Sequence, residues 1–84
     1  MKQTAEVETI LDNYPAKYEH GFTDAEIQDI TSKIPNINMK KVHDALNGNT
    51  CMVVDGTVVN YYNDVRLAIT CGIQNRDVDI NEWD

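Results

Sequence analysis

The dipeptide Asp55-Gly56, in the middle of the stretch TCMVVDGTVVNYY, is the feature that most restricts how this chain folds. An Asp-Gly pair flanked by alternating apolar residues is the strongest short-range signal for a β-hairpin, because a type I′ turn needs positive φ at both central positions. A two-residue turn also fixes the register of the two strands, so that Val53 faces Val58. The sequence therefore predicts a hairpin over about residues 50–62.

Both faces of this hairpin are largely apolar. Either helices cover both faces, or one face is a contact surface for another molecule. An open strand edge can pair with another chain, so a homodimer through residues 50–62 is one expected use of the hairpin. The first face carries Met52, Val54, Val59 and Tyr61, and the second carries Cys51, Val53, Val58 and Tyr62.

Helical periodicity lies on both sides of the hairpin. In GFTDAEI, Thr23 and Glu26 have the spacing of a capping box, which marks the start of a helix. Pro35 ends this helix, and Asn38 is a candidate N-cap for the next one. We predict helices over about residues 4–12, 24–34, 39–47 and 64–74, followed by an acidic tail over 77–84.

This order of three helices, a hairpin and a C-terminal helix predicts one small α+β domain spanning residues 1–84. Over roughly residues 4–62 the order resembles a winged helix, with a helix-turn-helix followed by a wing. The resemblance implies that the helix after the turn reads DNA. The residues that would contact DNA are Asn38, Lys40, Lys41, His43 and Asn47.

The charge of the chain opposes direct contact with DNA. The formal net charge is −7, and such a field repels a phosphate backbone. Lys40 and Lys41 offer little counterion release, and the predicted wing contains no Lys or Arg. A dimer that presents two such helices keeps a winged-helix transcriptional regulator as the alternative function.

The acidic surplus fits a basic protein partner better. We expect a small protein-binding module, an inhibitor or regulator that occupies the basic surface of a nucleic-acid-binding protein or nuclease. Our hypothesis is that its carboxylates stand in for phosphates. In size and charge the chain resembles small phage inhibitors of host defence nucleases, the anti-CRISPR proteins among them. The expected contact residues are Glu6, Glu8, Asp12, Asp24, Glu26, Asp29, Asp79, Glu82 and Trp83.

Trp83 has two interpretations. A tryptophan among carboxylates is typical of an interface hot spot for a basic partner. A small domain also needs every large apolar side chain, so Trp83 could instead cover the core of its own chain.

No motif for catalysis, a cofactor or a metal appears in the sequence. There is no phosphate-binding glycine loop, no G-x-S-x-G and no H-E-x-x-H. His43 and Asp44 are adjacent on one helix, so their side chains diverge by about 100°. Cys51 and Cys71 lack metal-site spacing, and we expect both to be small buried thiols. We therefore expect a non-enzyme without a metal or cofactor.

Two further expectations concern location. No apolar run reaches the roughly 18 to 20 residues that a transmembrane helix needs, and the N-terminus lacks the apolar core of a signal peptide. The sequence thus predicts an intracellular, cytoplasmic protein that does not bind membranes.

Overall fold

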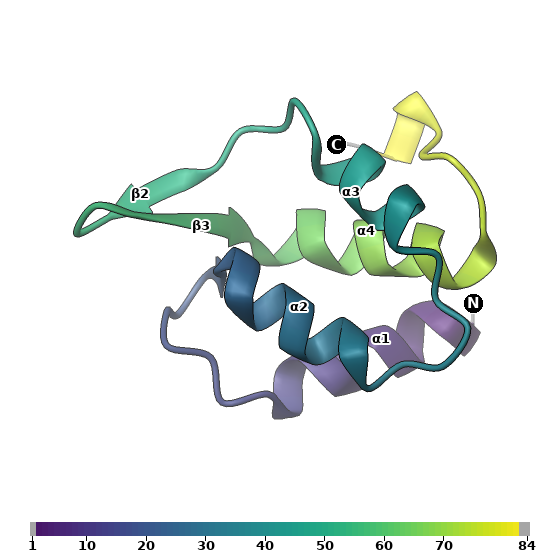
Figure 1. Cartoon of the computed structure of the whole chain (residues 1–84), viewed down its shortest axis with the longest axis horizontal. Coiled ribbons are helices and arrows are strands. Elements are labelled where there is room, and N and C mark those ends of the chain that lie inside the picture. Colours follow the sequence, from purple (N-terminus) through teal and green to yellow (C-terminus); the bar gives the residue numbers. More distant parts are fainter. Residues whose placement is uncertain (1, 83–84) are drawn as a thin grey trace.

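The structure is a computed structural model that describes residues 2–82, so Trp83 and both of its interpretations lie outside the described residues. Four helices and three strands make up an α+β domain, which confirms the α+β part of the predicted fold class (Figure 1). The elements are α1 (Lys2–Asn13), β1 (Gly21–Phe22), α2 (Asp24–Ser32), α3 (Met39–Leu46), β2 (Met52–Val54), β3 (Thr57–Tyr61), α4 (Tyr62–Gln74) and the 3₁₀ turn η1 (Ile80–Glu82).

The hairpin of β2 and β3 has the predicted turn and register. Asp55 has φ of 50° and Gly56 has φ of 80°, as a type I′ turn requires. Val53 pairs with Val58, and the hairpin projects from the helices (Figure 1). The prediction from the Asp-Gly pair is confirmed.

Strand β1 was not predicted. It is two residues long, too short for any period in the sequence, and it pairs antiparallel with the end of β3 to give the sheet order β1-β3-β2. Gly21 is required here, because a Cβ at this position would overlap the backbone carbonyl of Asn60. Only a glycine lets the two strands approach this closely.

Helix α4 is the centre of the domain. Val65, Ala68 and Ile69 are fully buried, and Leu67 and Cys71 on other sides of the helix are buried too. Such burial all round a helix is typical of one that is covered by neighbours on every side. The helix begins at residue 62, directly after β3 and two residues earlier than predicted.

Gly72, in the last turns of α4, is explained by the packing of α3. The backbone N–H of Asn38, the N-cap of α3, donates to the carbonyl of Gly72 at 2.9 Å. A Cβ on Gly72 would overlap the side chain of Val42 and come within 3.0 Å of Ile37. The missing side chain therefore allows α3 to lie directly against α4.

The connector between α2 and α3 is longer than predicted. Helix α2 ends at Ser32, so residues 33–38 separate the helices where the sequence predicted about four residues. Pro35 is the cause, because the residue before a proline is pushed out of the helical region. The N–H of Lys33 donates to the carbonyl groups of Ile30 and Thr31 and closes the last turn.

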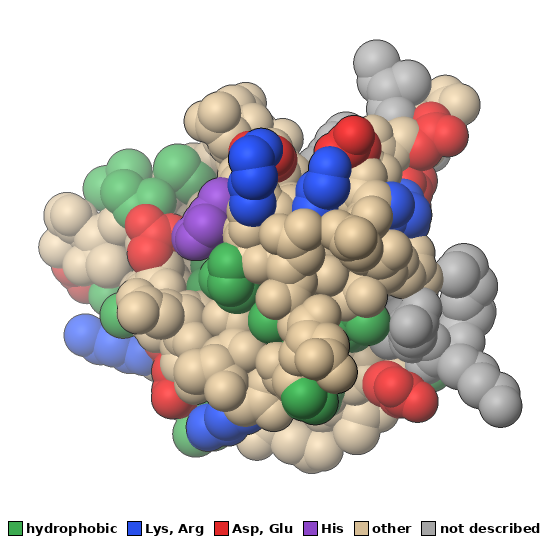
Figure 2. Space-filling model, turned by 45° about the vertical axis from the view of Figure 1, so that its right-hand side comes forward, with side chains coloured by type: hydrophobic (Ala, Val, Ile, Leu, Met, Phe, Trp, Pro, Cys, Tyr) green, Lys and Arg blue, Asp and Glu red, His purple; other side chains and the backbone are tan. Residues whose placement is uncertain are grey.

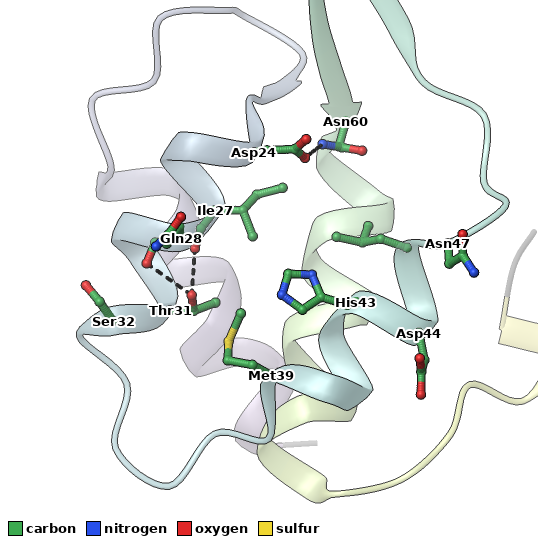
Figure 3. Close-up of a pocket in the computed structure, with 11 residues that line it drawn as sticks. Asp24, Ile27, Gln28, Thr31, Ser32, Met39, His43, Asp44, Asn47 and Asn60 are labelled. Atoms are coloured by element: carbon green, nitrogen blue, oxygen red, sulfur yellow. Dashed lines mark hydrogen bonds between the residues drawn. The ribbon is translucent and has the colours of Figure 1, made fainter.

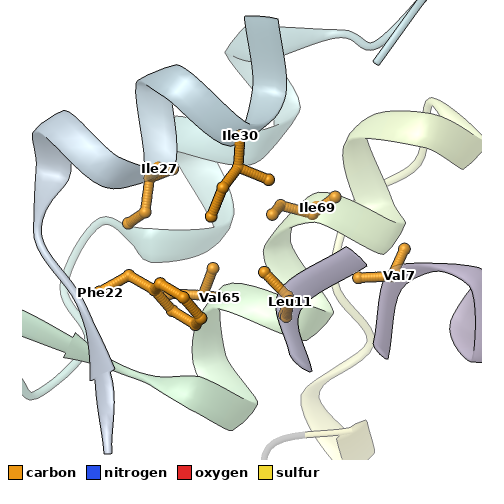
Figure 4. Close-up of a cluster of buried hydrophobic side chains, with 7 residues drawn as sticks. All are labelled: Val7, Leu11, Phe22, Ile27, Ile30, Val65 and Ile69. Atoms are coloured by element: carbon orange, nitrogen blue, oxygen red, sulfur yellow. The ribbon is translucent and has the colours of Figure 1, made fainter. Parts of the chain in front are cut away.

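The hydrophobic core lies where α1, β1, α2 and α4 meet (Figure 4). It includes Phe22 and Ile27, which flank the first turn of α2 in the positions of a hydrophobic staple. Its members are Val7, Leu11, Phe22, Ile27, Ile30, Val65 and Ile69.

None of the helices in residues 2–82 has the length and apolar character needed to cross a membrane.

Candidate functional site

A groove of about 790 Å³ lies between α2 and α3 (Figure 3). It exists because the two helices pack in different directions. Helix α3 packs against α4, whereas α2 packs against β1 and β3. The groove is lined by Asp24, Ile27, Gln28, Thr31, Ser32, Met39, His43, Asp44, Leu46, Asn47 and Asn60.

The groove has an apolar floor. Ile27 is buried, and Met39 and Leu46 are half-buried. Figure 3 shows Ile27 of α2 and Met39 and His43 of α3 pointing into the space between the helices. Met39, His43 and Leu46 stand at positions i, i+4 and i+7, so helical spacing identifies this shared face in the sequence. Neither Met39 nor Leu46 was predicted as a site residue.

The charged residues that line the groove are acidic. Asp24 lies at the end near the sheet, where it accepts a hydrogen bond from Asn60 Nδ2 at 2.9 Å. Asp44 lies at the outer edge, with Lys40 Nζ 2.9 Å from its carboxylate. No Lys or Arg belongs to the described lining.

The residues predicted to contact DNA are largely used within the protein. Asn38 caps α3, since its Oδ1 accepts from the backbone N–H groups of Lys40 and Lys41 at 3.1 and 3.4 Å. The Nδ2 of Asn38 donates to Asn75 at 2.7 Å. His43 and Asn47 line the groove.

Both lysines of α3 form ion pairs with carboxylates of this chain. Lys40 pairs with Asp44, and Lys41 Nζ lies 2.8 Å from Asp77 in the segment after α4. The hydrogen bond to Asp77 raises the pKa of Lys41, and the same contact lowers the pKa of Asp77. Figure 2 shows this pattern on one face, with lysine and arginine side chains next to carboxylates.

The predicted acidic contacts do not gather in one patch, and most have partners within the domain. On α1, Glu8 lies 3.9 Å from Arg66, and Asp12 accepts from the Tyr62 hydroxyl at 2.7 Å. Burial of the Tyr62 ring, together with this hydrogen bond, raises the pKa of Tyr62 to about 12. Glu6 is exposed on the same helix.

On α2, Glu26 completes the predicted capping box by accepting from the backbone N–H of Thr23 at 2.9 Å. Its other carboxylate oxygen accepts from the N–H of Lys17 at 3.0 Å. Asp29 accepts from the Tyr14 hydroxyl at 2.8 Å. These two carboxylates therefore hold the connector that precedes β1.

In the tail, Arg76 binds Glu82 through both guanidinium NH₂ groups, at 2.6 and 2.9 Å. This contact, together with the N–H of Asp79, lowers the pKa of Glu82 to about 2. The carboxylate of Asp79 accepts from the N–H of Asn81. Residues 76–82 thus form a structured turn in which these acids support η1.

One face of the hairpin is exposed. Val53 and Val58, which face each other, are 66% and 45% exposed, whereas Val59 on the opposite face is buried. Cys51 is exposed as well, so the prediction of two buried thiols holds for Cys71 and is wrong for Cys51. It is wrong because Cys51 precedes β2, beyond the cover of the helices.

The described residues contain no group of three or more His, Cys, Asp or Glu side chains that could hold a metal ion. No protein-family model, no curated protein and no solved structure matches this chain.

Proposed function

We propose that this protein is a small acidic binding module that docks on a basic protein and thereby inhibits or regulates a nucleic-acid-binding partner. One observation carries the proposal: the two lysines of α3 are paired with Asp44 and Asp77. The helix that would have to grip DNA therefore offers little free positive charge, while the chain keeps a net charge of −7.

The groove between α2 and α3 supplies a contact surface for such a partner. Its apolar floor fits apolar side chains of the partner, and Asp24, whose hydrogen-bond partner Asn60 is uncharged, attracts basic residues beside them. Polar side chains surround this floor, as in the core and rim of a protein interface. This arrangement suits a partner segment that combines apolar and basic residues.

The test uses two variants with the same change in charge. Asp24→Asn alters the groove, and Asp55→Asn alters an exposed carboxylate outside it. Each protein is immobilised and used to capture partners from cells that naturally contain it, at increasing salt. We expect a basic protein to be retained, to dissociate as salt screens the charges, and to bind the groove variant more weakly than the control variant.

Equal retention of the basic protein by both variants would show that the groove is not the contact surface. Retention that salt does not weaken would contradict the role of the carboxylates.

The alternative, a dimeric winged-helix regulator that contacts DNA through residues 38–47, requires Lys40 and Lys41 to leave their carboxylate partners. In that case Asp44→Asn with Asp77→Asn frees both lysines and strengthens retention of duplex DNA. Under the proposed function, the same two substitutions leave duplex binding absent or weak.

A further inference from the structure

A second cavity, about 410 Å³ in volume, lies where the end of α1, the connector to β1 and the start of α4 meet. The cavity and the groove each have a lining residue on the paired strands β1 and β3. Phe22 lines the cavity, and Asn60, with which Phe22 pairs, lines the groove.

Aromatic rings dominate the wall of this cavity. Tyr14, Tyr18 and Tyr62 are half-buried around it, and Phe22 is buried beneath. The ring centroid of Phe22 lies 6.2 Å from those of both Tyr14 and Tyr62. The Tyr14 and Tyr62 hydroxyls donate to Asp29 and Asp12, so hydrogen bonds hold both rings in place.

The charged side chains that line the cavity are Asp12 and Glu19, and both are exposed. Neither forms an ion pair with a lysine or arginine of the described residues. The carboxylate of Glu19 lies 3.8 Å from Nε2 of His20. The cavity thus combines aromatic faces with negative charge, the two features that attract a cationic side chain.

The chain already uses its tyrosines in this way. Lys17 Nζ lies 5.5 Å from the ring centroid of Tyr18, and Lys33 Nζ lies 5.7 Å from that of Tyr14. Neither lysine lines the cavity.

We infer that this cavity binds an arginine side chain of the basic partner, with the guanidinium stacked on the tyrosine rings and paired with Asp12 and Glu19. Arginine fits better than lysine, because its planar group stacks on aromatic rings and donates two parallel hydrogen bonds to a carboxylate. The inference rests on the proposed function for the basic character of the partner, and it adds the residue that is recognised.

The test uses three short peptides of equal length with a central arginine, lysine or citrulline, the last an uncharged analogue of arginine. Binding to the isotope-labelled protein is followed by NMR of the tyrosine rings. We expect the arginine peptide to shift the ring signals of Tyr14, Tyr18 and Tyr62 and to bind about tenfold more tightly than the citrulline peptide. We expect the lysine peptide to lie between them.

Asp12→Asn with Glu19→Gln should abolish the preference for arginine, because both changes keep the shape of the side chain and remove its charge. Asp55→Asn with Asp64→Asn, outside the cavity, is the control of equal charge. Tyr18→Leu removes one of the stacking rings and should weaken binding of the arginine peptide. Thermal unfolding of this variant checks that it is folded.

Shifts spread over other surfaces, or an equal effect of the control variant, would overturn the arginine site and leave the proposed function standing. If the arginine peptide does not bind and the capture experiment retains no basic protein, both proposals are overturned.

Discussion

The helical body buries its apolar side chains, whereas the hairpin leaves several of its own exposed. In the body, α4 is covered on all sides, and Val7, Ile30 and Ile69 are almost completely buried. In the hairpin, Val53 is 66% exposed although the strand is just as apolar. Stability is therefore concentrated in the helices, and the hairpin and the surface hollows are free to make contacts. This difference can be tested by substitutions that affect one region and spare the other.

The largest effect is expected in the core. Ile30→Ala removes a side chain that is 1% exposed and should lower the free energy of unfolding by about 2–5 kcal/mol. Val53→Ala in the hairpin should change it by less than about 0.5 kcal/mol. Urea unfolding measures both. Similar losses for the two variants would show that the hairpin belongs to the stable unit.

The next effect concerns the contact of α3 with α4. In an open helix, Gly72→Ala would stabilise the protein by roughly 1 kcal/mol. Here the added methyl group overlaps Val42, so we expect a loss of about 1–3 kcal/mol instead. Thermal and urea unfolding give the sign, and a stabilised variant would contradict the close approach of the two helices.

A smaller effect is expected at alkaline pH, at the start of α4. Burial and the hydrogen bond to Asp12 raise the pKa of Tyr62 from 10.0 to about 12, so the folded state favours the protonated phenol. The stability from this group is complete below pH 10 and is lost as the pH rises towards 12. Unfolding across this range should show the loss, and Tyr62→Phe should reduce it. An unchanged profile in that variant would assign the loss to another group.

The smallest effect on stability is expected on the exposed hairpin face. Val53→Lys should leave the free energy of unfolding within about 0.5 kcal/mol of the original. If the hairpin joins two copies of the chain, the same change should shift the sedimentation of the protein from dimer to monomer, because charge on an edge strand opposes pairing. If the original protein and the variant are both monomeric at all concentrations, the predicted homodimer is wrong.

The sequence was informative where the signal is local. The turn at Asp55-Gly56, the capping box of Thr23 and Glu26, and the cap at Asn38 all depend on residues close together in the chain, and all three are present. Features that depend on distant residues were missed. Strand β1 forms only because β3 lies beside it, and the reason for Gly72 became clear only when α3 was placed against it.

The candidate sites follow the same rule. The ion pair of Lys41 with Asp77 joins residues 36 positions apart, so the sequence could not indicate that this lysine has a partner within the chain. Glu19 and Tyr18 were overlooked because the connector has no period, and only the fold brings them beside Asp12.

The most direct test of the main claim is a selection of duplexes from a random DNA library by the purified protein at physiological salt. Because Lys40 and Lys41 are paired with Asp44 and Asp77, we expect that no sequence is enriched. Enrichment of a defined motif by this protein, lost when both lysines are replaced by alanine, would contradict it.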